Sequence, residues 1–552
     1  MRQAKTIEYA AVCVSLWSLA AVLQWKAGAF AAEFSSHPDE SAHYITGLMI
    51  RDYIASGHYT APLAYAEQYY AHYPKVAFGM WPPCFHIVEA LWTLLFTPGR
   101  ASVLLLMALI TAATATLIYH VLHRKYGRTA ALAGGALYVL LPLVQASTAT
   151  VMADNLVALL DLWAMIWLVR YLESVRTRYA VMFGVAAALS MSTKANGVAL
   201  VLLPAVALAV TGRWPLLRAR GLYYAAAIVL VFGAPWPLLS FWMIHRSMGG
   251  EAVTAASIAG SALAYVRVLW GSLGWGLVPF CLVGIAVFAM RRSRDEQDFT
   301  LAGAVALLSS VWAYHSLIAN GSARYMVAAL PPAVILAVAG FMWVIRNVAP
   351  RAAPMPARAA AWGVLAGGLF VTQTWAVPHK PCQGFGQAAH YLLTTPEFAN
   401  GNFLVVSSAR GEGAFITEVA MHDHRPGHMV LRSSKVLTNT NWYGSIYRLR
   451  YDDSKALRDF LDRAPIDALL LDTRPPQDKP DEAAFRLEQK VCGAIQDDPN
   501  WKLRERFPKH RGAAPWIDLY ARVGPQPSGS VTLDLRYTLG RDIVATEGEG
   551  GK

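Results

Sequence analysis

The chain has 552 residues, of which 55% are hydrophobic and 15% are charged, and its mean hydropathy is +0.34. Because soluble domains carry about 25% charged residues, this composition excludes an ordinary soluble protein and predicts a chain that crosses a membrane many times. The net charge of +12 would suit a nucleic-acid partner. The basic residues are, however, grouped as membrane topology groups them, so we expect no nucleic acid.

Apolar segments that are long enough to cross a bilayer, or nearly so, recur from the N-terminus to residue 377. The first has no clean cleavage site followed by a soluble domain, so we expect a retained helix rather than a signal peptide. The pair 180–193 and 196–212 is short and could be a hairpin that crosses only in part, which leaves the count open by about two. About eleven spans are predicted, near residues 8–30, 99–122, 129–147, 153–172, 180–193, 196–212, 221–243, 273–290, 299–318, 325–346 and 359–377.

Lys and Arg residues gather in alternate loops between these spans, and the opposite loops are sparse in them. This positive-inside pattern predicts a cytoplasmic N-terminus and an outward-facing loop at 31–98. An odd number of spans also places the C-terminal part outside, and we expect a multi-pass protein of a bacterial cytoplasmic membrane. The basic groups are Arg2 and Lys5; Arg124, Lys125 and Arg128; Arg176 and Arg178; Arg213, Arg218 and Arg220; Arg291, Arg292 and Arg294; and Arg346, Arg351 and Arg358.

The loop at 31–98 is long and aromatic, and it contains two amphipathic stretches. ESAHYITGLMIRDYIA and PPCFHIVEALWTLLF both have apolar residues near helical spacing, with Trp81 and Trp92 as aromatic anchors. We therefore expect two helices that lie in the outer membrane interface.

Two adjacent carboxylates, Asp39 and Glu40, precede the first of these helices. One interpretation is a helix N-terminus, since Ser36 and Asp39 have capping-box spacing, Pro38 suits the first turn, and acidic side chains favour that end of the helix dipole. The other is a general base that deprotonates a hydroxyl acceptor while a lipid-borne group is attacked. These residues alone leave both interpretations open.

The character of the chain changes near residue 378. GNFLVVSSARG and PIDALLLDTRPP each predict a buried strand followed by a turn, and SKALRDFLDRA between them predicts an amphipathic helix. We expect a soluble α/β domain outside the cytoplasm over 378–537 and a disordered tail over 538–552. A disulfide between Cys382 and Cys492 is one possibility for such a domain, and two thiols are the other.

Two polar motifs of this domain are weak candidates for ligand sites. MHDHRPGH places three histidines, His422, His424 and His428, near Asp423, but the spacing matches no standard zinc pattern. RGEGAF lacks the full G-x-G-x-x-G of a dinucleotide site. We therefore expect neither a metal nor a cofactor, and a domain that recognises the acceptor or covers a cavity.

The first loop resembles that of the GT-C membrane glycosyltransferases, which include protein O-mannosyltransferases and the bacterial aminoarabinose transferases that modify lipid A. PDESAHYITGLMIRDYIASGHYTAP is similar to their D-E pair, interfacial helix and following turn. The chain departs from many relatives in having Trp81 where a basic residue precedes the P-P pair. Four further motifs follow in the family's order, and the resemblance covers residues 1–377: WPPCFHIVEALW, TVMADNLVALLDLWAMIW with Asp154, ALSMSTKANGVALVLLP with Thr193 and Lys194, and ARYMVAALPPAVILAVAG with Arg324 and Tyr325.

The resemblance implies an inverting glycosyltransferase that moves a sugar from a polyprenyl-phosphate donor to the hydroxyl of a protein, lipid or surface glycan. Asp39 would be the base, with Glu40 orienting it or binding sugar hydroxyls. Phosphate is a good leaving group, so cationic stabilisation suffices without a general acid. The donor would be bound by Arg324, Lys194, Asp154, Tyr325, His43 and Lys75, the last in place of the missing basic residue.

Plainer roles and other protein classes stay open beside this interpretation. Arg324 and Lys194 would also suit interfacial anchors or snorkelling side chains, and Asp154 would suit a helix cap. A transporter or flippase would show paired repeats and polar groups near the middle of the membrane, whereas the charges here cluster toward one face. A non-catalytic scaffold would leave the motifs of the first loop unexplained.

Overall fold

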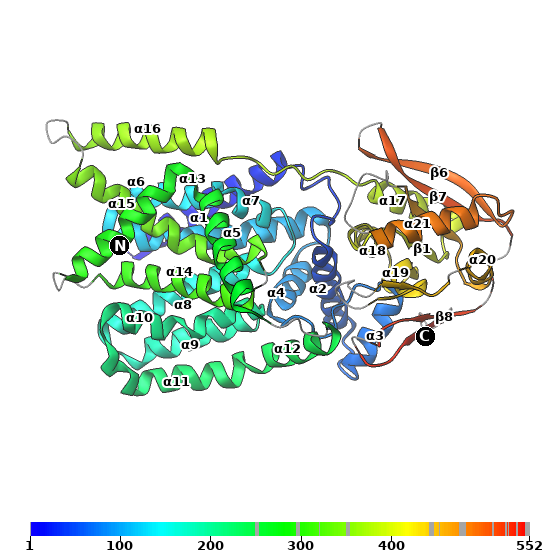
Figure 1. Ribbon diagram of the computed structural model, residues 1–552, viewed down its shortest axis with the longest axis horizontal. Helices are drawn as coiled ribbons and strands as arrows, with labels where there is room; N and C mark the ends of the chain where they lie inside the picture. Colours follow the sequence, from blue (N-terminus) through cyan, green and yellow to red (C-terminus); the bar gives the residue numbers. More distant parts are fainter. Residues whose placement is uncertain are drawn as a thin grey trace.

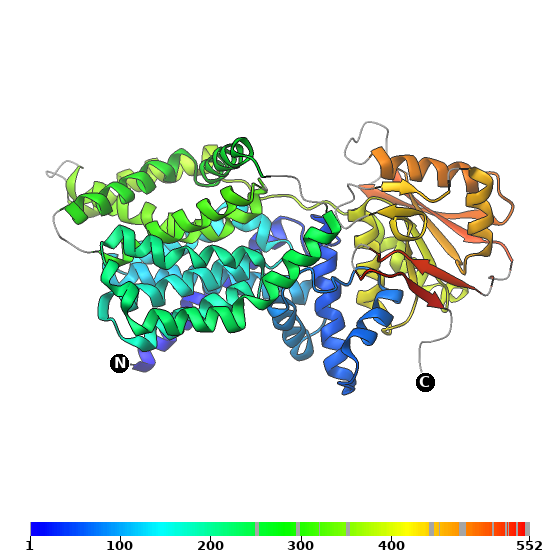
Figure 2. The same cartoon turned by 60° about the horizontal axis from the view of Figure 1, so that its bottom comes forward.

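The computed structural model describes residues 2–248, 253–293, 298–319, 321–348, 354–440, 447–451, 453–473, 482–510, 513–524, 527, 529–536 and 539–546. A bundle of long helices forms one part, and a domain built on a β-sheet forms the other, with three shorter helices between them (Figure 1, Figure 2). The expected class, a polytopic α-helical membrane protein with a C-terminal α/β domain, is confirmed.

Six helices within the described residues are long and apolar enough to cross a membrane, and two bent pairs bring the number to eight if each pair is one span. The pair α6 (Arg128–Leu140) and α7 (Pro142–Thr148) bends by 64° at a proline, which cannot donate to the preceding turn. The predicted number of eleven stays a prediction. The six helices are α1 (Arg2–Lys26), α5 (Arg100–Tyr126), α8 (Asp154–Ser174), α13 (Ala255–Ser293), α14 (Phe299–Ile318) and α15 (Leu330–Asn347), the last continuing from η4 (Ala323–Ala329).

The remaining helices of the bundle are short, bent or peripheral. The stretch predicted as the short pair forms α9 (Thr177–Met191), η1 (Ala195–Val201) and α10 (Leu203–Thr211). The second bent pair, with an angle of 43°, comprises α11 (Arg220–Ile228) with η3 (Val229–Gly233) and then α12 (Pro235–Met248). Helix α16 (Met355–Gln373) leads toward the C-terminal domain (Figure 1).

Helices α13 and α15 pack backbone against backbone. A Cβ added to Gly284 of α13 or to Gly340 of α15 would clash with a carbonyl oxygen of the facing helix. Small residues allow this close approach, and van der Waals contact then holds helices together where lipid gives no hydrophobic gain. Helix α13 extends well beyond the predicted span at 273–290 and continues through a bend at Gly274, whose φ of +62° suits glycine.

Three helices of the first loop lie between the bundle and the C-terminal domain (Figure 1). Helices α2 (Pro38–Ser56) and α4 (Cys84–Leu95) occupy the two amphipathic stretches, and α3 (Pro62–His72) is an additional helix between them. Helix α2 packs against α4 and also against α18 (Ala409–His422) of the C-terminal domain.

The C-terminal domain contains a five-stranded sheet with the strand order β2-β1-β5-β7-β6. The strands β2 (Val430–Arg432), β1 (Phe403–Val406) and β5 (Ala468–Asp472) are parallel, and β7 (Ala513–Arg522) and β6 (Trp501–His510) continue the sheet antiparallel. Every residue of β1 and β5 is buried, as is typical of central parallel strands. The other elements are α17 (Phe385–Thr394), η5 (Pro396–Phe398), α19 (Ser433–Val436), β3 (Thr438–Thr440), β4 (Tyr447–Leu449), α20 (Ser454–Arg463) and α21 (Glu482–Ile495).

A strand lies inside the segment that was predicted to be disordered. Strand β9 (Ile543–Thr546) pairs antiparallel with β8 (Ser530–Leu533), so the prediction of a disordered tail from residue 538 is wrong for this strand. Apolar residues alternate along this strand, so one face, including Ala545, is buried. The glycine-rich sequence around the strand makes this alternation hard to recognise. Residues 547–552 lie outside the described residues.

The cysteines and the histidine-rich loop have structural contacts. Cys382 and Cys492, both within the described residues, form no disulfide, and the Cys382 thiol donates to the carbonyl of Ala31 at 3.5 Å. Asp423 of the histidine-rich loop accepts hydrogen bonds from the Tyr73 hydroxyl and from the backbone N–H of His428, each at 2.7 Å. The described part of the chain holds no group of three or more side chains placed to bind a metal ion.

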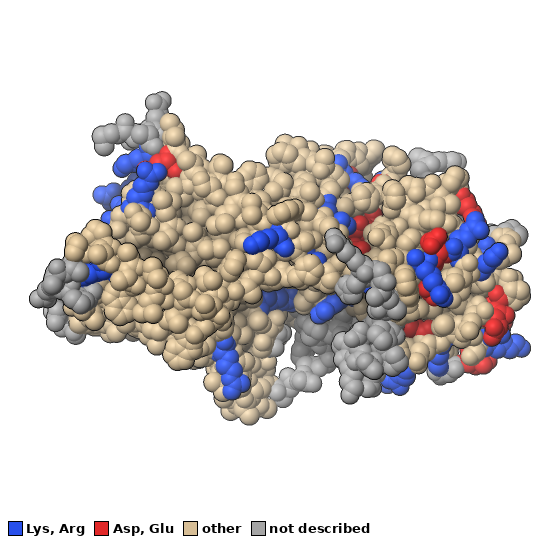
Figure 3. All heavy atoms as spheres, turned by 90° about the horizontal axis from the view of Figure 1, so that it is seen from above, with Lys and Arg blue, Asp and Glu red and all other residues tan. Residues whose placement is uncertain are grey.

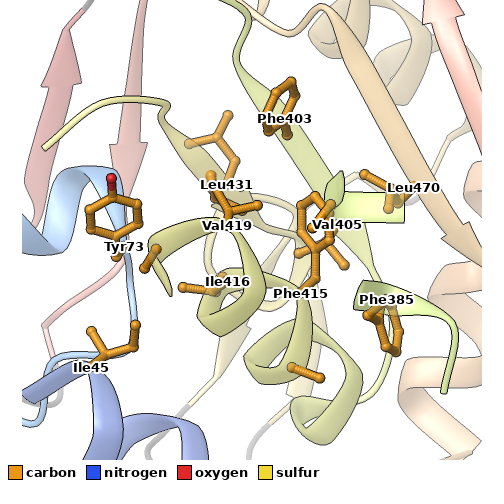
Figure 4. Close-up of a cluster of buried hydrophobic side chains, with 14 of the residues drawn as sticks. Ile45, Tyr73, Phe385, Phe403, Val405, Phe415, Ile416, Val419, Leu431 and Leu470 are labelled. Carbon is orange, nitrogen blue, oxygen red and sulfur yellow. The ribbon is translucent and has the colours of Figure 1, made fainter. Parts of the chain in front are cut away.

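One hydrophobic core joins the first loop to the C-terminal domain (Figure 4). Ile45 of α2 and Tyr73 after α3 belong to the same buried cluster as Ile416 and Val419 of α18. Residues of the sheet strands belong to the same cluster. Helix α2 is thus packed both against α4 and against the C-terminal domain. On the face seen in Figure 3, the helical part is mostly uncharged, whereas charges of both signs mix on the C-terminal domain.

Candidate active site

The N-terminus of α2 presents the paired carboxylates. The His37 ring caps the helix by accepting a hydrogen bond from the backbone N–H of Asp39 at 3.1 Å, and Pro38 occupies the first turn. Burial lowers the pKa of His37 to about 4; the Asp39 carboxylate opposes this shift and the charges of Arg324 and Lys194 add to it, so the ring is neutral and can accept. The Asp39 carboxylate lies 3.3 Å from the same ring nitrogen, and its charged partner comes from another part of the chain.

That partner is Arg324, which η4 places at the start of the span that continues into α15. Its Nη1 donates to Oδ2 of Asp39 at 3.0 Å and lies 3.4 Å from Nδ1 of His37. The side chains of Asp39 and Arg324 are each 21% exposed, so solvent still reaches the pair. The Nε of Arg324 is buried and has no hydrogen-bond partner among the described residues. A guanidinium with one N–H unsatisfied is an incomplete anion site.

A second, buried ion pair stands beside the first. Nζ of Lys194 donates to both carboxylate oxygens of Asp154 at 2.8 Å. The Tyr325 ring links the two pairs, since Nζ of Lys194 and the guanidinium of Arg324 each lie 5.4 Å from its centroid. The imidazole of His315 stacks on the same ring with centroids 5.0 Å apart. The structure therefore brings together Asp39, Arg324, Tyr325, Asp154 and Lys194, which we call the outer cluster.

Glu40 faces away from the outer cluster. Its side chain is fully buried, and Oε1 accepts from Nζ of Lys380 at 2.7 Å and from the backbone N–H of Val151 at 3.2 Å. Oε2 accepts from the backbone N–H of Ser36 at 2.9 Å. Of its two predicted roles, contact with sugar hydroxyls does not fit a carboxylate that has no exposed surface and three protein donors. The geometry fits the other predicted role, to orient Asp39, because these bonds hold the start of α2.

Two side chains predicted to bind the donor lie outside the outer cluster. Lys75 is buried between α2 and the C-terminal domain, where Nζ donates to the carbonyl of Ala409 at 3.0 Å. His43 is buried against α4, where its ring stacks on Trp81 with centroids 4.1 Å apart and its Nδ1 lies 3.0 Å from Nε2 of His86. The C-terminal domain covers Lys75 and the first-loop segment that holds Trp81 and α4 covers His43, so the geometry does not favour a donor-binding role for either, and both roles stay predictions.

The sequence analysis missed three side chains that lie around the outer cluster or around the start of α2. His37 directly precedes the Pro-Asp-Glu motif, so its position as a possible cap could have been recognised. His315 and Lys380 stand in no motif, and Lys380 meets Glu40 across 340 residues of chain. Only the fold brings these two side chains to the site.

One family profile matches the chain. Residues 81–239 match the family described as dolichyl-phosphate-mannose-protein mannosyltransferase. That segment contains Asp154 and Lys194 but neither Asp39 nor Arg324. No curated protein sequence matches the chain.

Solved structures share the fold. ArnT from Cupriavidus metallidurans is 15% identical, and the match covers 95% of this chain and 100% of that one, with TM-scores of 0.60 in the apo state and 0.59 bound to undecaprenyl phosphate. The oligosaccharyltransferase of Archaeoglobus fulgidus, tethered with an acceptor peptide, is 12% identical and has a TM-score of 0.51 over 83% of this chain and 69% of that one. At these identities the structures show a common fold. The chain thus matches a mannosyltransferase family over residues 81–239 and shares its fold with ArnT and with an oligosaccharyltransferase.

Proposed function

We propose that the protein is a glycosyltransferase that moves a sugar from a polyprenyl-phosphate donor to an acceptor hydroxyl at the outer face of a bacterial cytoplasmic membrane, with inversion at the anomeric carbon. The observation that carries the proposal is the pairing of Asp39 with Arg324, whose buried Nε still lacks a partner among the described residues. A base and an incomplete anion site stand side by side, which is the arrangement that attack opposite a phosphate leaving group requires. The fold shared with ArnT bound to undecaprenyl phosphate supports the donor class.

The chemical step needs one base and a stabilised leaving group. The acceptor hydroxyl gives its proton to Asp39 while its oxygen forms a bond to the anomeric carbon. The bond from that carbon to the phosphate oxygen breaks, and the electron pair leaves with the polyprenyl phosphate. Since a phosphate is stable with this charge, no side chain has to protonate it.

Arg324 and Lys194 are the side chains proposed to face the phosphate. The guanidinium can add a bond from its Nε to a phosphate oxygen, and charge-assisted bonds of this kind are about twice as strong as neutral ones. Lys194 is held by Asp154, so its ammonium is fixed in place before the donor arrives. Both cations would counter the charge that develops on the leaving oxygen.

Glu40 is proposed to be a positioning residue, and the C-terminal domain to form the acceptor side of the site. Helix α18 begins beside the start of α2, since Lys75 joins the carbonyl of Ala409 to that of Pro38 with bonds of 3.0 and 3.3 Å. A domain over 378–537 that reaches this point would line the approach of a protein, lipid or glycan acceptor. The positive-inside pattern supports its location outside the cytoplasm.

The first test compares the wild type with Asp39→Asn. Each protein is purified in detergent and incubated with a panel of radiolabelled polyprenyl-phosphate sugars and a membrane extract. Release or transfer of one sugar by the wild type, with a loss of about 10²-fold or more in Asp39→Asn, is expected if Asp39 is the base. The donor that reacts also names the sugar.

Glu67→Gln is the matched control, because Glu67 is another carboxylate of the first loop that pairs with an arginine, Arg541, away from the outer cluster. It should turn over the donor at the wild-type rate. Equal turnover by Asp39→Asn and Glu67→Gln would remove Asp39 as the base. Binding of the donor without cleavage in detergent, together with its transfer across the bilayer when the protein is reconstituted in vesicles, would favour a transporter instead.

A further inference from the structure

A second polar site lies at the opposite end of α8 from the outer cluster. A cavity of about 220 Å³ opens between the C-terminal ends of α5 and α8 and the start of α14. One water molecule needs about 10–15 Å³ of such space, so the cavity accommodates a polyatomic group. Asp154 begins α8 and Arg170 lies 16 residues further along it, which separates the two sites by about 24 Å along the helix. The polar lining consists of His120, Arg124, Lys125, Arg170, Glu173 and Thr300.

The lining is cationic. Three basic side chains, Arg124, Lys125 and Arg170, face a single carboxylate, that of Glu173. Lys125 is already neutralised by an ion pair with Asp298. In the part of the chain that the structure describes, neither Arg124 nor Arg170 forms an ion pair. Two guanidinium groups therefore remain for an anion.

The Arg170 side chain is held in place from two sides. Its guanidinium lies over the Trp167 ring, 4.9 Å from the centroid, and its Nη2 lies 3.4 Å from Nε2 of His120. His120 is fixed in turn by the Tyr9 hydroxyl of α1 at 3.0 Å from its Nδ1. A guanidinium fixed in this way loses little conformational freedom when it binds a phosphate.

The surroundings of the cavity fit the headgroup region of a membrane. Met165, Ile166 and Val169 of α8 form an apolar wall below the charged groups, where acyl chains would begin. The basic groups stand at the ends of spans, and the loop that carries Arg124 is one of those predicted to face the cytoplasm. Basic pockets between membrane helices on that side are typical sites for anionic lipid headgroups.

We propose that this cavity binds a phosphate group, with Arg124 and Arg170 donating to its oxygens. The phosphate can come from the headgroup of an anionic phospholipid in the surrounding leaflet or from free phosphate in solution. The site is separate from the outer cluster and holds no group of the proposed reaction. Its occupation would stabilise the ends of α5 and α8, since a ligand that binds only the folded protein adds to stability.

The test removes both guanidinium charges in the double variant Arg124→Gln/Arg170→Gln. Wild type and variant, purified in the same detergent, are titrated in three separate arms with cardiolipin, with phosphatidylcholine and with inorganic phosphate. Binding is followed by native mass spectrometry and by the shift in thermal unfolding temperature. Arg176→Gln/Arg178→Gln is the matched control, because it removes two arginines beyond the end of α8 that do not line the cavity.

We expect cardiolipin to bind the wild type and the control equally well, and to bind the double variant at least about tenfold more weakly. Phosphatidylcholine should bind all three proteins alike. A shift with inorganic phosphate in wild type and control, lost in the double variant, would support the same site with a soluble ligand. Equal binding by all three proteins, or no binding of cardiolipin and phosphate to the wild type, overturns the proposal. The single variant Arg124→Gln, at an exposed position, gives the same comparison if the double variant does not fold.

Discussion

Arg324 is the residue of the outer cluster whose side chain can contact both a carboxylate and a phosphate. A guanidinium carries several N–H groups in a fixed plane, so Nη1 can hold Asp39 at 3.0 Å while Nε remains directed elsewhere. A lysine at this position would supply a charge, but it could not serve a carboxylate and a phosphate with the same geometry. The neutral ring of His37 caps α2 and does not compete with Asp39 for a proton.

Arg324→Lys is therefore expected to lower kcat/KM for the donor by about 10²-fold, because one charge-assisted bond to the leaving group is lost. Steady-state rates at varied donor concentration measure the change. Arg425→Lys is the control, since Arg425 also pairs with a first-loop aspartate, Asp52, at 2.7 Å but lies at the other end of α2. A kcat/KM in Arg324→Lys equal to that of the control would contradict a phosphate role for this arginine.

At the scale of the elements, α2 shows what the sequence could and could not predict. The order of the motifs and the alternating topology predicted that these charged residues lie toward one face, and the structure places Asp39, Asp154, Lys194, Arg324 and Tyr325 together, while their roles stay predictions. The partner of Glu40 could not be predicted. Lys380 lies in an irregular segment with no periodic pattern, and a contact across 340 residues depends on how the whole chain packs.

The buried pair of Glu40 and Lys380 is expected to position the catalytic end of α2. In Lys380→Met, the Glu40 carboxylate stays buried without its cation, which costs about 3–5 kcal/mol of stability. The folded fraction should also show a lower kcat with little change in KM, since Asp39 is the adjacent residue. Lys380→Arg should restore part of kcat, and so should the double variant Glu40→Gln/Lys380→Met. Thermal unfolding and single-turnover rates measure the two effects.

Lys509→Met is the matched control for this prediction. Lys509 forms a buried pair with Asp472 inside the C-terminal domain, so its loss should lower stability without changing kcat of the folded protein. If Lys380→Met lowers stability but leaves kcat at the control value, the pair holds the fold and has no positioning role.

At the scale of the whole molecule, the C-terminal domain and the first loop form one unit. Arg425 of the domain donates to Asp52 of α2 at 2.7 Å, and Glu33 accepts from the backbone N–H groups of Gln383 and Gly386 at 2.7 and 3.0 Å. The shared hydrophobic core adds to these bonds (Figure 4). The change in composition near residue 378 predicted a separate domain, but composition cannot show which surface of a domain is buried against its neighbour.

Lys75 makes this interface sensitive to pH. Its ammonium is buried between α2 and α18, and burial lowers its pKa from 10.5 to about 7; Arg432 and Lys435 nearby act in the same direction, while Glu412 and Asp39 oppose them. Above a pH of about 7 the folded protein releases this proton, whereas the unfolded chain keeps it up to about 10.5. The unfolded state then binds more protons, so the contribution of Lys75 to stability rises with pH, by at most about 1.4 kcal/mol per pH unit.

Replacement of Lys75 by Met removes this dependence, because methionine has no charge to bury. The difference in unfolding temperature between wild type and Lys75→Met, measured in detergent from about pH 6 to about pH 9, should therefore move in favour of the wild type as the pH rises. Lys502→Met, an exposed lysine of β6, is the control and should give a difference that is independent of pH. A constant difference for Lys75→Met as well would mean that Lys75 keeps its proton throughout. The ammonium would then be compensated at the interface, and the contact of α18 with α2 would be an electrostatic one that screening by salt, rather than pH, should weaken.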